Sequence, residues 1–147
     1  MKTPFPVVPV HRLAGAVLML ALVLALSMAL PAISSPLDRE WGSPLGPIPA
    51  GDLLALAVAA FSAALIGGAG FRYRAAGLAV VVWVLRLAAL VIVAPAMTET
   101  SSGDLFLAHL PGLPLGVAVA WLAAWAGERF ASARRREKAP RPRARWR

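Results

Sequence analysis

Four long apolar stretches constrain the fold of this chain more than any other feature. They cover residues 13–32, 53–71, 75–97 and 105–127. About 20 residues of apolar helix cross the roughly 30 Å hydrocarbon core of a bilayer, so each stretch is long enough to span a membrane. A soluble core could not absorb four such runs in 147 residues, of which 59% are hydrophobic and 15% charged. We therefore predict an all-α membrane protein, with four transmembrane helices in an antiparallel bundle.

The distribution of basic residues predicts the orientation of this bundle. Lys2 and Arg12 precede the first stretch, Arg72 and Arg74 lie between the second and third, and residues 128–147 carry nine Lys and Arg against two Glu. The other two connections are net acidic. Because cytoplasmic flanks collect Lys and Arg, both termini are expected in the cytoplasm. The abundance of Arg, Ala, Gly and Pro is typical of GC-rich bacteria, so we expect a multi-pass protein of the bacterial inner membrane.

The connections differ in length and composition. The sequence GFRYR, residues 70–74, predicts a short cytoplasmic turn between the second and third helices. The outer connection between the first and second helices is rich in Pro and Gly, which predicts an irregular surface loop. We assign residues 1–130 to the four-helix transmembrane domain and 131–147 to a basic, disordered cytoplasmic tail.

The first stretch has an alternative interpretation as a cleaved secretory signal. Basic residues precede its apolar run, and Ser27–Ala29 offers small residues to a peptidase. Its 20 residues exceed the roughly 7–15 of a signal core, which favours a retained helix. Cleavage would leave three helices without moving the C-terminus.

One formal charge, Arg86, lies in the middle of the third stretch. It is eleven residues from each end, or roughly 17 Å at 1.5 Å per residue. Estimates of the cost of a central Arg run from about 2.5 to more than 10 kcal/mol, so the charge needs compensation. Trp83, three residues earlier on the same helix face, can cover the guanidinium by a cation-π contact. Candidate acceptors are Asp104 and Asp52 at the outer helix ends, and Glu128 at the inner end is a third acidic candidate.

His109 extends this polar column from Asp104 inward toward Arg86. We therefore predict a polar cluster of Arg86, His109, Asp104 and Trp83 in the outer half of the bundle. A buried network that fixes helix register is the favoured interpretation. An anion or lipid-phosphate site is the second, because Arg suits phosphate and carboxylate recognition, and a proton-linked role for His109 is the third.

Side chains for catalysis or metal binding are scarce inside the four stretches. The chain has no Cys, and its strongly polar residues within the stretches are Ser27, Ser62, Arg86 and His109. A single histidine cannot supply the three or four ligands of a zinc centre. We therefore expect no enzyme, no catalytic residues, no metal site and no cofactor.

Small residues recur at helical spacing in two stretches. The fourth has Gly112, Gly116, Ala120 and Ala124, and the second has Ala55, Ala59, Ala63 and Gly67. Such stripes allow close approach of helices. Contact within one bundle is the favoured interpretation, and a homodimer or partner-subunit face through the fourth stretch is the alternative. Pro111 and Pro114 should bend that helix, because proline removes a backbone donor.

The basic tail predicts a surface contact with anionic lipid headgroups, to which each basic residue contributes about 1 kcal/mol. Nucleic acid is the less favoured partner, because the tail follows a membrane helix directly and lacks regular aromatic interleaving. The expected lipid contacts are Arg134, Arg135, Arg136, Lys138, Arg141, Arg143 and Arg145.

No motif in the chain identifies a known family. The sequence best fits a small non-catalytic accessory or structural component of a membrane complex. The alternative is a small transporter or channel for an anionic substrate that uses Arg86 and His109.

Overall fold

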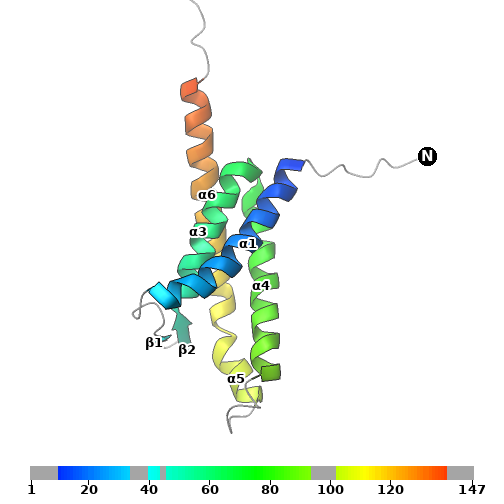
Figure 1. Cartoon of the computed structure of the whole chain (residues 1–147), viewed down its shortest axis with the longest axis vertical. Coiled ribbons are helices and arrows are strands. Elements are labelled where there is room, and N and C mark those ends of the chain that lie inside the picture. The colour runs from blue at the N-terminus through cyan, green and yellow to red at the C-terminus, as the bar shows by residue number, and fades with distance from the viewer. Residues whose placement is uncertain (1–9, 34–39, 44–45, 94–101, 139–147) are drawn as a thin grey trace, which may run out of the picture.

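The computed structural model describes residues 10–33, 40–43, 46–93 and 102–138 (Figure 1). These residues form four long helices, one short helix and a two-stranded ribbon. In chain order they are α1 (Val10–Ile33), β1 (Glu40–Ser43), β2 (Gly46–Pro49), α3 (Ala50–Gly67), α4 (Phe71–Val93), α5 (Ser102–His109) and α6 (Gly112–Lys138). The long helices pack as a bundle, and α6 extends beyond the others at one end (Figure 1).

Helix α3 lies at the centre, because α1 packs against one of its faces and α6 against another, while α4 packs mainly on α6. The α3 stripe of small residues predicted from the sequence is fully buried from Ala55 to Gly67. A Cβ added at Gly15 of α1 would lie 3.0 Å from the Ala63 carbonyl oxygen, and one at Gly127 of α6 would lie 2.6 Å from that of Phe61. Small residues thus let the α3 backbone touch both neighbours.

A tight turn at residues 68–70 joins α3 to α4. Gly68 and Gly70 have φ angles of 72° and 82°, in the left-handed region that glycine adopts without steric cost. The Gly68 amide donates to the Ala64 carbonyl at 3.2 Å and closes the end of α3. The sequence predicted that the second span ends at 71 and the third begins at 75. The second helix instead ends at Gly67 and the third begins at Phe71, because these glycines stop the helix earlier.

The connection between α1 and α3 contains regular structure, which corrects the prediction of an irregular loop. Strands β1 and β2 pair antiparallel, with Trp41 opposite Ile48 and Ser43 opposite Gly46. Two intervening residues are the commonest hairpin length. A two-stranded ribbon has only edge strands, and these tolerate the prolines of β2.

The fourth apolar stretch is broken rather than continuous, which corrects the single span predicted at 105–127. Helix α5 ends at His109, residues 110–111 form a turn, and α6 begins at Gly112. Pro111 has no amide hydrogen and restrains Leu110 away from helical angles. The Leu113 amide donates to the Leu110 carbonyl at 3.1 Å across the break.

Helix α6 continues to Lys138, so residues 131–138 are helical where the sequence predicted disorder. This segment is rich in Ala, Arg, Glu and Lys, which are strong helix formers. Basic residues near a helix C-terminus also complement the macrodipole. The helix therefore crosses the boundary drawn at residue 130. The rest of the predicted tail, residues 139–147, lies outside the described residues.

Two of the described helices are long and apolar enough to cross a membrane, at Val10–Ala29 in α1 and over the whole of α3. The predicted end of the third span at 97 lies outside the described residues, and α4 is described as far as Val93. Its described part carries Arg72 and Arg74 at one end and Arg86 toward the other.

Candidate functional site

An ion pair between α4 and α3 is the main polar feature in the described part of the bundle. The Arg86 Nη1 donates to the Asp52 carboxylate, and the two side chains are 32% and 29% exposed. Asp52 lies in the first turn of α3, where the positive end of the helix macrodipole also favours a carboxylate. Asp52 was one of the two outer acidic candidates named from the sequence, and it contacts Arg86.

This pair places the charge of Arg86 away from the middle of its span. The sequence placed Arg86 at the centre of its span, about 17 Å from either boundary. In the structure its guanidinium lies at the level of the first turn of α3, because it contacts Asp52 there. The long side chain thus brings its charge to the end of a neighbouring helix.

Trp83 lies beside Arg86 and joins α4 to α6. The Arg86 guanidinium carbon lies 5.3 Å from the centroid of the Trp83 ring, within the range of a cation-π contact. The indole Nε1 donates to the Gly112 carbonyl at 2.7 Å. Trp83 therefore packs over the start of α6 while its ring covers the cation.

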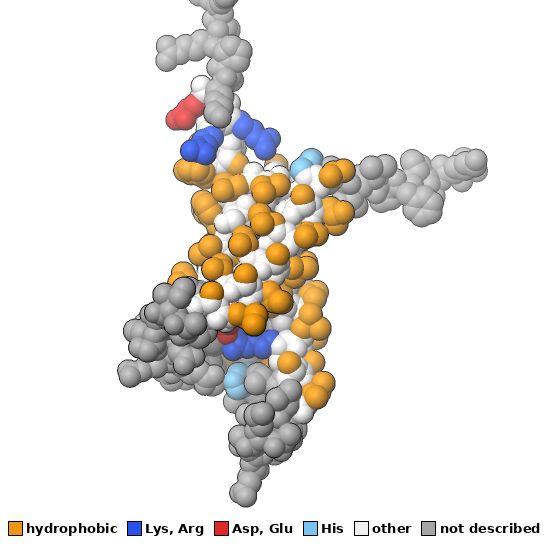
Figure 2. Space-filling view, in the orientation of Figure 1, with side chains coloured by type: hydrophobic (Ala, Val, Ile, Leu, Met, Phe, Trp, Pro, Cys, Tyr) orange, Lys and Arg blue, Asp and Glu red, His pale blue; other side chains and the backbone are white. Residues whose placement is uncertain are grey.

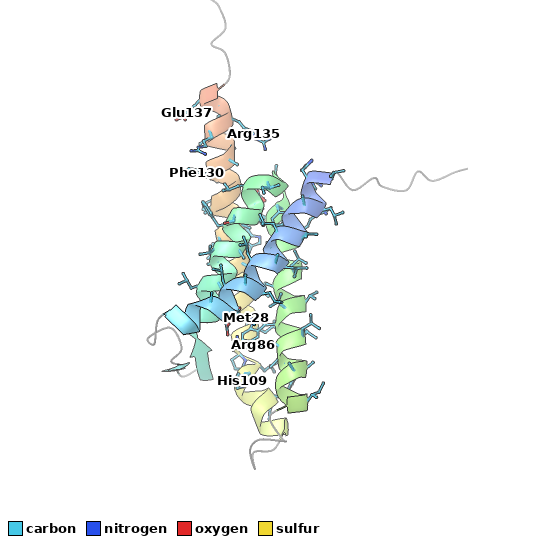
Figure 3. All side chains as sticks on the ribbon, in the orientation of Figure 1. Met28, Arg86, His109, Phe130, Arg135 and Glu137 are labelled. Atoms are coloured by element: carbon cyan, nitrogen blue, oxygen red, sulfur yellow. The ribbon has the colours of Figure 1, made fainter. Side chains whose placement is uncertain are left out.

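The structure describes less of His109 and Asp104, the other two residues of the predicted cluster. Figure 3 shows His109, the last residue of α5, just below Arg86 in that view. Both His109 and Arg86 have interaction partners. The side chain of Asp104 lies outside the described residues.

A cavity of about 480 Å³ adjoins the ion pair. It lies between α1, α3 and α4, and α6 contributes one residue to its wall. Asp52, Arg86 and Ser27 contribute polar groups, and the remaining wall is apolar, including Val23, Leu24, Met28, Leu56 and Val82. Figure 3 labels Met28 and Arg86 close together at this level. The cavity suits an apolar molecule better than a free anion, because Asp52 already balances the charge of Arg86.

The small-residue stripe of α6 is occupied within the chain. A Cβ added at Gly116 would lie 2.6 Å from the Trp83 Nε1, and one at Gly112 would lie 2.7 Å from a Trp83 ring carbon. Ala120 and Ala124 are fully buried. A homodimer or partner subunit would therefore have to contact a different face of the bundle.

Basic residues from three segments gather at the opposite end of the bundle. Arg12 at the start of α1 donates from Nη2 to the Ala69 carbonyl at 3.5 Å. Glu128 of α6 accepts a hydrogen bond from the Arg72 backbone amide at 2.8 Å, in the first turn of α4. The segment ends predicted to share the cytoplasmic side thus lie together.

Arginine side chains at this end stack on aromatic rings. The Arg72 guanidinium lies 5.6 Å from the Trp121 ring, that of Arg129 lies 4.6 Å from Trp125, and that of Arg134 lies 5.3 Å from Phe130. The last two pairs have the i, i+4 spacing of neighbours on one helix face. That spacing is visible in the sequence, whereas the contacts of Arg72 with Trp121 and Glu128 join distant residues without a local signal.

No family model matches the chain, and comparisons with curated proteins and with solved structures gave no significant match.

Proposed function

We propose that the chain is a small integral protein of the bacterial inner membrane, with four spans and with both termini in the cytoplasm. The observation that carries this proposal is the separation of charge from exposed apolar surface. Large apolar side chains cover the outside of the bundle between its two ends, as with Leu13 at 60% exposure, Leu24 at 69% and Leu85 at 63% (Figure 2). Contiguous apolar surface of this kind favours lipid over water as the surrounding solvent.

The charged side chains support the same placement. Asp52 and Arg86 lie toward one end of the bundle, where α4 continues past them to the exposed Ile92, and Arg12, Arg72 and Glu128 lie at the other end. In this arrangement α4 and the α5–α6 pair accompany α1 and α3 across the bilayer. Because α1 packs on α3 with Met19 and Val23 buried, a retained first helix fits the bundle better than a cleaved signal.

Within the membrane, we assign the chain a non-catalytic accessory or structural role in a larger complex. The ion pair supports this assignment, because it joins α3 to α4. Asp52 also neutralises the positive charge of Arg86, which an anionic substrate would otherwise contact. The basic extension of α6 supports contact with anionic headgroups at the cytoplasmic face, through Arg134, Arg135, Arg136 and Lys138. The other predicted lipid contacts, Arg141, Arg143 and Arg145, lie outside the described residues.

The absence of cysteine from the native chain gives a direct test of topology. Single-cysteine variants Gly103→Cys in α5, Ala133→Cys in α6 and Val81→Cys in α4 replace exposed residues. A membrane-impermeant maleimide should label Gly103→Cys in intact cells, and should label Ala133→Cys only after lysis. Val81→Cys should stay unlabelled until detergent is added, because lipid covers it. Labelling of Ala133→Cys in intact cells would contradict the orientation, and release of the protein by alkaline carbonate would contradict membrane insertion.

The accessory role has its own test. Affinity purification in a mild detergent should recover defined partner subunits with the native chain. Recovery of the chain alone, as a stable monomer, would contradict a role in a complex.

A second candidate function is transport of an anionic substrate through Arg86 and His109. The observation that favours it is that both Arg86 and Asp52 line the 480 Å³ cavity, so an anion that displaced the Asp52 carboxylate would meet the guanidinium. Transport predicts that Arg86→Leu abolishes flux into proteoliposomes while the protein stays folded and inserted. The accessory role predicts loss of stability or of complex assembly instead.

A further inference from the structure

A second cavity, of about 290 Å³, lies at the end of the bundle that carries the basic residues. The α3–α4 turn forms one wall, and the part of α6 around residues 125–135 forms the other. Its polar lining consists of three arginines, one hydroxyl and one carboxylate, from Arg72, Arg129, Arg135, Ser132 and Glu128. None of these residues takes part in the Arg86 site.

Stacking orients two of these arginines. Arg72 lies over the Tyr73 and Trp121 rings, with its guanidinium carbon 5.1 and 5.6 Å from their centroids, and Arg129 lies over Trp125. A stacked guanidinium uses its face, so the N–H groups at its edge can still donate. The Arg72 Nη2 donates to the Tyr73 hydroxyl at 3.4 Å, and its other edge groups can meet a planar or tetrahedral anion. The Arg72 Nε is buried and has no hydrogen-bond partner among the described residues.

The carboxylate in the lining does not cancel this positive charge. Glu128 is a single acidic group against three arginines, and its Oε1 already accepts the Arg72 backbone amide at 2.8 Å. The cavity also adjoins the N-terminus of α4, where the helix macrodipole favours negative charge. The remaining potential in the cavity is therefore positive.

We propose that this cavity binds the phosphate group of an anionic phospholipid from the cytoplasmic leaflet. Arg72, Arg129 and Arg135 donate to the phosphate oxygens, and Ser132 lies within the same lining. The lipid source rests on the proposed membrane placement, in which this end lies at headgroup level, where aromatic rings such as Trp125 are favoured. Figure 3 shows Arg135 on the extension of α6, beyond the packed part of the bundle.

The test uses the full chain in a zwitterionic detergent at low salt. Short-chain phosphatidylglycerol, phosphatidylcholine and inorganic phosphate are titrated separately, and tryptophan fluorescence reports binding because Trp125 lines the cavity. Phosphatidylglycerol should bind saturably and more tightly than phosphatidylcholine. Loss of one charge-assisted contact in Arg135→Gln should weaken its binding about tenfold.

Arg74→Gln is the matched control, because it removes the same charge from the same end of the bundle at a residue that neither lines the cavity nor belongs to the proposed headgroup contacts. It should change the Kd for phosphatidylglycerol less than twofold. Equal weakening by the two variants would overturn the proposal, since it would indicate diffuse attraction to the basic end of the bundle. Binding of inorganic phosphate without binding of phosphatidylglycerol would overturn the lipid assignment. These titrations need no bilayer, so their failure is distinct from failure of the topology test.

Discussion

Replacement of Arg86 by leucine should destabilise the bundle measurably. Removing one partner of a buried ion pair costs about 3–5 kcal/mol, whereas exposed pairs contribute about 0–1 kcal/mol. The Arg86 and Asp52 side chains are 32% and 29% exposed, which places this pair between the two limits. We therefore expect Arg86→Leu to lower the free energy of unfolding by about 1–3 kcal/mol. At about 2–4 °C per kcal/mol for a chain of this size, the Tm should fall by roughly 2–12 °C.

A double-mutant cycle separates the ion pair from other effects of the substitution. Arg86→Leu, Asp52→Asn and the double variant are unfolded reversibly in mixed micelles with tryptophan fluorescence as the signal. The double variant should lose less stability than the two single losses combined, with a coupling energy of about 1–2 kcal/mol. Arg74→Leu, near the other end of the same helix, controls for the loss of a cation from α4. Additive losses at Arg86 and Asp52 would refute the assignment of the pair as a stabilising contact.

Four further substitutions test the packing and the other end of α4. Gly116→Ala should cost about 1–3 kcal/mol in the same unfolding assay, because its Cβ would lie 2.6 Å from the Trp83 ring nitrogen. Gly77→Ala meets nothing within 4 Å and should instead stabilise α4 by up to about 1 kcal/mol, so equal effects of the two substitutions would contradict the packing. Trp83→Phe removes the indole donor and should cost about 0.5–1.5 kcal/mol beyond any change in packing, and an unchanged Tm would contradict that hydrogen bond. Glu128→Gln should cost about 0.3–1 kcal/mol at low salt and less at high salt, and a loss independent of salt would exclude an electrostatic effect at the start of α4.

The sequence predicted the long helices because hydrophobic length is a local property. It also predicted which ends share a side, since Arg12, Arg72 and Glu128 lie together in the described structure. The charged residues at these ends can be recognised in the sequence because they flank the apolar stretches. The prolines indicated a bend in the fourth stretch, but not that the helix would stop at His109 and restart at Gly112.

The details of the candidate sites depend on how the helices rotate against each other, which no local pattern specifies. Asp52 and Asp104 were both reasonable acceptors for Arg86, because both lie near the start of a helix that the sequence predicts to begin on the same side. The fit of the Trp83 ring on Gly112 and Gly116 fixes the facing sides of α4 and α6. The sequence named all three residues, yet it assigned the ring to Arg86 and the glycines to a helix stripe. The structure joins these two features into one contact.

The acidic residues that contact α4 explain how this helix is held at both ends. Toward its C-terminal end, Arg86 contacts Asp52 in the first turn of α3. At its N-terminal end, the Arg72 backbone amide donates to Glu128 of α6. The two contacts are fourteen residues apart on α4, or roughly 21 Å along its axis. In both places the carboxylate lies at a helix N-terminus, where the macrodipole already stabilises negative charge. These two carboxylates therefore lie at helix N-termini, and Arg86 contacts its acidic partner there rather than at the centre of the apolar region.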